Sequence, residues 1–118
     1  MKKFIWIHGP TIFIALLIFI LSSIPRITVP DMGFSLMDKL FHFLEFGVFG
    51  FFLQRSYSSL NINLRYRFFI VFMMGFFYGV LDEFHQSFIP GRIASAGDIL
   101  ANSLGILLAQ FFYGVRKN

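Results

Sequence analysis

Four long apolar runs make up most of this chain, and short polar segments separate them. The first run, from Phe4 to about Ser22, has roughly 19 residues, and a helix rising about 1.5 Å per residue would cross most of the ~30 Å hydrocarbon core of a membrane with that length. Hydrophobic residues make up 57% of the sequence and charged residues only 14%, compared with about 25% charged residues in soluble proteins. The sequence therefore predicts a membrane protein, and its 19 phenylalanines suit lipid-facing helices.

We expect an all-α fold, a polytopic four-helix transmembrane bundle that forms one domain over residues 1–118. The predicted helices cover about residues 4–22, 37–54, 68–88 and 98–114. Two of the helix starts carry a capping pattern, because Ser35 precedes Asp38 and Ser95 precedes Asp98 by three residues.

The first run has two features that bear on its interpretation. Pro10 lacks a backbone donor, which predicts a kink in the helix or the start of its regular part. Lys2 and Lys3 before the run also fit a cleaved signal peptide, but the apolar stretch is longer than the usual 7–15 residues or so, and further apolar runs follow it. We therefore interpret this run as the first transmembrane helix.

Polar segments predict the later connections. The stretch from Arg55 to Arg67 holds three arginines and no acidic residue, and we expect it to join the second and third helices. Pro90 and Gly91 fit positions i+1 and i+2 of a type II turn. The turn should separate the third helix from the fourth.

Small residues recur every four positions in the last two helices. Gly75 and Gly79 form a G-x-x-x-G motif, and Ala101, Gly105 and Ala109 form a second stripe. Such stripes let the backbones of neighbouring membrane helices approach closely. We expect both to lie at helix–helix contacts.

The charged residues are divided unevenly between the two ends of this four-helix arrangement. One end holds the basic residues Lys2, Lys3, Arg55, Arg65, Arg67, Arg116 and Lys117. The other end holds Arg26, Lys39 and Arg92 together with the acids Asp31, Asp38, Glu45, Asp82, Glu83 and Asp98. The positive-inside rule then predicts that both termini are cytoplasmic. The basic excess is thus explained by topology, and we expect no nucleic-acid partner.

The second predicted helix carries a polar face. Asp38, His42 and Glu45 are spaced i, i+4, i+7 and share one side of the helix, with Lys39 beside them. Ionisable groups inside a membrane are costly and generally mark a functional site.

The third and fourth helices carry polar residues at the same depth. Asp82, His85 and Gln86 share a face, and Glu83 lies about a third of a turn away. The fourth helix adds Asp98 and Asn102 at i, i+4, and Arg92 follows the third helix. A polar pocket between the helices is the simplest way to keep these groups out of lipid.

Three motifs carry a resemblance to a known family: Asp38-Lys39-x-x-His42, Asp82-Glu83-x-His85-Gln86-x-Phe88-x-Pro90-Gly91-Arg92 and Asp98-x-x-x-Asn102-x-x-Gly105. They are similar to the signature of the VanZ-like family of small bacterial membrane proteins, over about residues 37–110. The family is named for a protein that gives low-level resistance to teicoplanin, a glycopeptide that acts on the cell wall outside the membrane. The resemblance implies a multi-pass protein of the bacterial cytoplasmic membrane with a role in the cell envelope and in antibiotic resistance, without specifying a reaction. Phe46 departs from the pattern, because many members have Tyr there.

Two interpretations of the polar residues involve no reaction. In the first, Lys39 and Arg92 pair with the acids and tie the helices together, since buried charges need partners. In the second, an anionic group is held by the N-termini of the second and fourth helices, which point outward, together with Lys39, Arg92 and the histidines. The nearby acids favour a ligand with both donors and charge, such as a lipid-linked sugar phosphate or a peptide terminus.

Two further interpretations involve chemistry. Burial of Glu83 or Glu45 beside a histidine would suit general acid–base catalysis on a lipid-linked cell-wall or polysaccharide precursor. Alternatively, His42, Glu45, His85 and one of the two adjacent acids, Asp82 or Glu83, are credible ligand types for zinc or iron.

We predict a VanZ-like membrane protein that acts on a surface or lipid-linked ligand, with membrane lipid as its surroundings and no assigned cofactor or metal. The alternative is a small membrane enzyme. The candidate catalytic residues are Glu83, His85, His42 and Asp82. The candidate ligand-binding residues are Asp38, Lys39, Glu45, Gln86, Arg92, Asp98 and Asn102.

Overall fold

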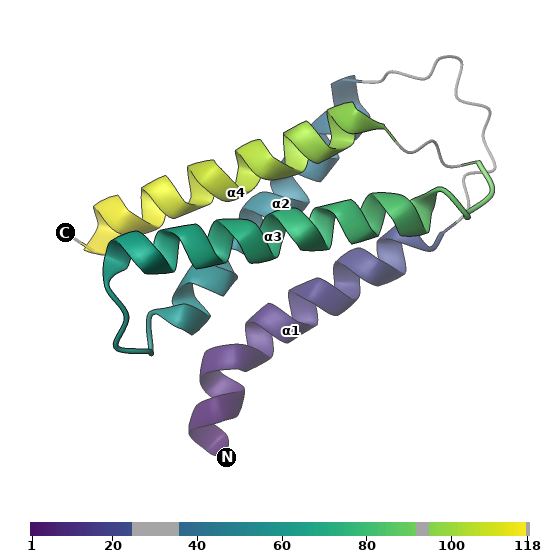
Figure 1. Cartoon of the computed structure of the whole chain (residues 1–118). Helices are drawn as coiled ribbons and strands as arrows, with labels where there is room; N and C mark the ends of the chain where they lie inside the picture. Colours follow the sequence, from purple (N-terminus) through teal and green to yellow (C-terminus); the bar gives the residue numbers. More distant parts are fainter. Residues whose placement is uncertain (25–35, 92–94, 118) are drawn as a thin grey trace.

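The computed structural model describes residues 1–24, 36–91 and 95–117, and in these parts the chain forms four α-helices and no strand (Figure 1). The helices are α1 (Lys2–Ser22), α2 (Leu36–Tyr57), α3 (Leu64–Gln86) and α4 (Ala96–Lys117). The predicted all-α, four-helix bundle is therefore confirmed. Successive helices run in opposite directions, so the end of α3 lies at the same end of the molecule as the starts of α2 and α4 (Figure 1).

Three of the helices have the length and composition of a membrane span: α1, α3 and the part of α4 from Ala96 to Tyr113. Helix α2 does not meet that description, because Asp38, Lys39 and Glu45 interrupt its apolar sequence. It packs against α1, α3 and α4, and these neighbours give its polar side chains partners away from lipid. The surrounding helices thus allow α2 to lie in the bundle despite its charged side chains.

The connection between α2 and α3 is shorter than the sequence indicated. Helix α2 continues to Tyr57, and α3 begins at Leu64, where the Asn63 side chain accepts a hydrogen bond from the backbone N–H of Arg65 at 3.0 Å. An Asn in this position satisfies one of the free donors of the first helical turn. Arg65 and Arg67 consequently belong to the helix and not to the predicted loop.

Helix α3 ends at Gln86, two residues before the predicted end. The turn that follows has Gly91 at a φ of 79°, which is the value that position i+2 of a type II turn requires. Pro10 lies inside α1 without ending it, and the first turns of α1 diverge from the rest of that helix (Figure 1). The capping pattern at Ser35 lies outside the described residues.

The small-residue stripes lie at helix contacts, as predicted. A Cβ atom added at Gly105 would meet the carbonyl oxygen of Phe43 and the backbone nitrogen of Gly47 on α2. A Cβ atom at Gly75 would meet the Ile106 side chain on α4. These glycines therefore set how closely α4 approaches α2 and α3.

The centre of the bundle is apolar, and its buried cluster is formed by Ile18, Phe46, Phe49, Leu53, Val71 and Ile106. Phe46 is completely buried, and its ring lies 6.2 Å from that of Tyr78. Many other large apolar side chains are exposed on the outside, as expected for helices in lipid. The polar side chains gather at the two ends of this apolar centre.

Candidate ligand-binding site

One end of the bundle holds a group of polar side chains from all four helices, which we call the polar end cluster. Its described members are Ser22, Ser23, Asp38, Lys39, His42, Glu45, Asp82, Glu83, His85, Gln86, Ser95, Asp98 and Asn102. The predicted site residues among them do come together, whereas Arg92 lies outside the described residues. Sequence reasoning missed Ser22 and Ser23, whose only signal is their position at the end of an apolar run, and it gave Ser95 only the role of a helix cap.

Asp82 is directed toward α1. Its carboxylate accepts a hydrogen bond from the Ser22 hydroxyl and a second from Gln86 Nε2 at 3.5 Å. Gln86 Nε2 also donates to Ser22 Oγ at 3.2 Å. Because all three side chains are buried, this triad fixes the end of α1 to α3.

His85 also contacts α1, but one turn nearer the edge of the cluster. Its Nε2 lies 2.8 Å from the Ser23 hydroxyl, and its ring stacks on Phe19 with 4.6 Å between centroids. Among the described side chains His85 makes these contacts with α1, whereas Glu83, another candidate catalytic residue, lies near His42.

Lys39 is held by α4. Its Nζ donates to Asp98 Oδ1 at 2.7 Å and to Ser95 Oγ at 3.3 Å, and the Asp98 side chain is only 1% exposed. A buried carboxylate needs such a partner, because an unpaired charge in a low-dielectric interior is expensive. The ion pair thus joins the first turns of α2 and α4.

His42 lies at the centre of the cluster and is buried. Its Nδ1 is 3.1 Å from Asn102 Oδ1, so Nδ1 donates and the amide oxygen accepts. Its Nε2 is 3.5 Å from Asp98 Oδ2 and 4.0 Å from Asp38 Oδ2. One imidazole therefore contacts groups from both α2 and α4.

Glu83 reaches toward α4 and not toward α1. Its Oε2 accepts a hydrogen bond from the backbone N–H of Ser95 at 2.9 Å, while the N–H of Asp98 donates to Ser95 Oγ at 3.1 Å. Glu83 thus takes the place that the second residue of a capping box usually has, since Asp98 itself is engaged by Lys39. Asp82 and Glu83 are both buried but serve different neighbours.

The second oxygen of Glu83 differs from the other carboxylate oxygens described here. Oε1 is buried, has no hydrogen-bond partner and lies 3.9 Å from His42 Nδ1. The amide nitrogen of Asn102, whose amide oxygen contacts the same ring nitrogen of His42, is likewise buried without a hydrogen-bond partner. Unsatisfied polar atoms in a buried place usually indicate a missing group or a chemical role.

A groove opens beside this cluster between α1, α2 and α3, with a volume of about 250 Å³. It is lined by Leu21, Ser22, Ile24, Asp38, Phe41, His42, Glu45 and Gln86. Four of the predicted site residues therefore face this groove, whereas Lys39, Glu83, Asp98 and Asn102 lie behind it, toward α4.

Two groups of side chains bring ligand atoms close enough to hold a metal ion: Asp38, His42 and Asp98, and His42, Asp82 and Glu83. The set considered from the sequence included Glu45 and His85, and neither belongs to these groups. His42 is common to both.

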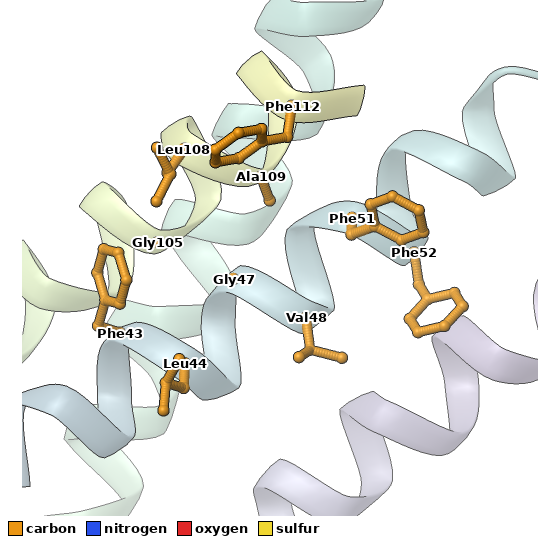
Figure 2. A pocket seen from close by; sticks show the side chains of 10 residues that line it. All are labelled: Phe43, Leu44, Gly47, Val48, Phe51, Phe52, Gly105, Leu108, Ala109 and Phe112. Atoms are coloured by element: carbon orange, nitrogen blue, oxygen red, sulfur yellow. The ribbon is translucent and has the colours of Figure 1, made fainter. Parts of the chain in front are cut away.

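A second hollow, of about 370 Å³, lies against α2 and α4 and is entirely apolar in its side chains (Figure 2). Phe43, Phe51 and Phe112 stand around it, and Gly47 and Gly105 form its floor (Figure 2). It carries no group that could react, and its phenylalanines agree with the expected lipid-facing surface.

Comparison with known proteins supports the resemblance found in the motifs. No curated protein and no solved structure matches this chain. The model of the VanZ/LLP1 family, in contrast, matches residues 4–117, which cover α1 from Phe4 onward, the other three helices and the polar end cluster. The protein therefore belongs to the VanZ/LLP1 family and is a VanZ-like membrane protein.

Proposed function

We propose that this protein acts in the cell envelope by holding a surface or lipid-linked ligand in the groove between α1, α2 and α3, and that this binding lowers susceptibility to glycopeptides such as teicoplanin. The observation that carries the proposal is the groove itself, in which acidic and histidine side chains face an open space of about 250 Å³. Family membership supports the link to glycopeptides.

The lining of the groove is amphipathic. Asp38, His42 and Glu45 line it together with the apolar side chains of Leu21 and Phe41. Phe41 is 57% exposed, so its ring is available to an acyl or prenyl chain in the surrounding lipid. A ligand with a polar head and a hydrocarbon tail matches both kinds of surface.

The charges of the groove favour a head group that donates hydrogen bonds. Ionised carboxylates only accept hydrogen bonds, and the groove includes the carboxylates of Asp38 and Glu45. Lys39, the cation in the described part of the cluster, is bound to Asp98 at 2.7 Å. Sugar hydroxyls or an ammonium group therefore suit the groove better than a bare phosphate.

The charge distribution supports an outward position for this groove. The arginines of the second and third helices lie at the end opposite the groove: Arg55, Arg65 and Arg67. By the positive-inside rule that end is cytoplasmic. The groove would then face the side on which cell-wall precursors are exposed to glycopeptides.

The test is teicoplanin susceptibility in a host that lacks the protein. We compare wild type with Glu45→Gln, which removes a charge from the groove lining, and with the control His85→Gln, which alters the same end of the bundle outside the groove lining. All three are expressed to equal membrane levels. Wild type and the control should protect, and Glu45→Gln should not. Full protection by Glu45→Gln, or none by wild type, would contradict the proposal.

A second candidate function is acid–base catalysis on a lipid-linked precursor, and the contact between Glu83 and His42 favours it. Glu83 Oε1 is buried 3.9 Å from His42 Nδ1, and such a pair can serve general acid–base chemistry if it closes to hydrogen-bond distance when a substrate binds. Glu83→Gln preserves the shape of the side chain but removes its acid function. The assay is chemical analysis of the lipid-linked precursors. If the protein is an enzyme, cells with wild type should contain a modified precursor and cells with Glu83→Gln should not. If the protein only binds its ligand, neither should contain one.

A further inference from the structure

His42, Asp82 and Glu83 form a compact set of donor atoms between α2 and α3. One ring nitrogen of His42 and one carboxylate oxygen from each acid all lie within 4.8 Å of one another, and all three residues are buried. Neither the groove nor the proposed binding of an envelope ligand accounts for this arrangement, because Asp82 and Glu83 do not line the groove.

Glu83 Oε1 points into this set. It has no hydrogen-bond partner, and the Glu83 residue is only 3% exposed. Leaving such a group unsatisfied in a buried place is costly, and more so for a charged group. A cation between Glu83 Oε1 and His42 Nδ1 would remove this cost.

The distances fit a metal ion. Zinc binds nitrogen and carboxylate oxygen at about 2.0–2.2 Å, so two donors of one ion lie no more than about 4.3 Å apart. Glu83 Oε1 and His42 Nδ1 are 3.9 Å apart, already within that limit. Closing the remaining separations from at most 4.8 Å needs only small side-chain rotations.

The surroundings of His42 have the form that metal sites usually have. Metal-bound histidines generally donate their other ring N–H to a carboxylate, which orients the ring. Here Nδ1 faces Glu83, and Nε2 lies 3.5 Å from Asp98 Oδ2. Lys39 in turn holds Asp98 at 2.7 Å. A metal ion at Nδ1 would replace the proton that this nitrogen donates to the Asn102 amide oxygen at 3.1 Å, and that oxygen would then be a fourth possible ligand.

The other group, Asp38, His42 and Asp98, is less suitable. Lys39 Nζ lies 2.7 Å from Asp98, and its positive charge would repel a cation bound there. The Asp38 side chain is also 18% exposed. Asp98, paired with Lys39, is therefore better suited to orient His42 than to bind the metal ion itself.

We propose that His42 Nδ1, Asp82 and Glu83 bind one divalent metal ion of the zinc class between α2 and α3, with Asp98 orienting His42. One nitrogen and several oxygen ligands suit Zn²⁺, since imidazole favours it over Mg²⁺ or Ca²⁺. The ion would join α2, which lacks the composition of a membrane span, to α3. This proposal is independent of the glycopeptide function.

The experiment is zinc titration of the full chain, purified in detergent and treated with a chelator. Calorimetry and elemental analysis give affinity and stoichiometry for wild type, His42→Ala, Glu83→Gln, Asp98→Asn and the control His85→Gln. We expect one zinc per chain in wild type and the control. Loss of the supporting carboxylate in Asp98→Asn should weaken binding by about 10–100-fold, and His42→Ala and Glu83→Gln should weaken it at least as much.

Thermal unfolding of wild type gives a second readout that does not require any variant to fold. Zinc should raise the unfolding temperature as its free concentration increases above the dissociation constant, and chelator should reverse the effect. The proposal is overturned if wild type neither binds zinc nor is stabilised by it. It is also overturned if His42→Ala and Glu83→Gln bind as tightly as wild type, or if His85→Gln loses binding as they do.

Discussion

Replacing Gly105 by alanine should loosen the contact between α2 and α4 and, with it, the polar end cluster. An added Cβ atom would lie 2.9 Å from the backbone nitrogen of Gly47 and still closer to the carbonyl oxygen of Phe43. Because both obstacles are backbone atoms, no side-chain rotation relieves the clash. The two helices must move apart.

The size of the effect follows from two opposing terms. Overpacking of a close contact costs about 1–3 kcal/mol, and we take the upper end because the obstacles are rigid. Alanine gains about 1 kcal/mol over glycine in a helix. The net loss is about 2 kcal/mol, which reduces the ratio of folded to unfolded protein by about 30-fold.

Gly47→Ala is the matched control in the same interface. Its added Cβ atom would lie 3.6 Å from the carbonyl oxygen of Gly105, an ordinary van der Waals distance, so only the gain of about 1 kcal/mol applies. The two variants should differ by about 3 kcal/mol in free energy of unfolding. Unfolding by sodium dodecyl sulfate in mixed micelles, followed by circular dichroism, measures this difference. Equal stabilities, or a less stable Gly47→Ala, would refute the steric argument.

Two other predictions concern the ion pair and the orientation. Lys39→Met should destabilise the protein by about 3–5 kcal/mol because it leaves Asp98 buried without its cation, and the double variant Lys39→Met/Asp98→Asn should recover most of the loss in the same unfolding assay; additive losses would argue against the pair. Reporter proteins that are active only in the cytoplasm should be active when fused to either terminus, as the positive-inside rule predicts. An inactive fusion at either terminus would contradict the predicted topology.

Much of the fold could be predicted from hydropathy, because a membrane leaves few alternatives to apolar helices. The helix ends were less predictable. Arg65 and Arg67 suggested a loop by their charge, yet they lie in the first turns of α3, since Asn63 caps that helix and a helix end can extend beyond the lipid. The charge pattern predicts which end of the bundle faces the cytoplasm, but it does not show where the backbone stops being helical.

The residues of the candidate site could be predicted, but not their partners. Helical spacing placed Asp82, His85 and Gln86 on one face and left Glu83 to the side. In the structure that difference of about 100° per residue sends Asp82 to α1 and Glu83 to α4. The packing around Gly75 decides which helix lies on each side of α3. The periodicity of one helix shows which residues share a face, but it does not show which helix that face contacts.

The interpretation of the cluster as a structural network and its interpretation as a binding site apply to different parts of it. Lys39 and Asp98 are bound to each other behind the groove, so substitutions there should act first on folding. Glu45 lines the groove, so its substitution should act on the proposed ligand binding, and the unfolding assay measures any change in stability beside it. His42 belongs to both parts, because it lines the groove and contacts Asp98 and Asn102. A loss of function at His42 is therefore informative only beside a measured stability, whereas a loss at Glu45 with unchanged stability identifies the ligand site directly.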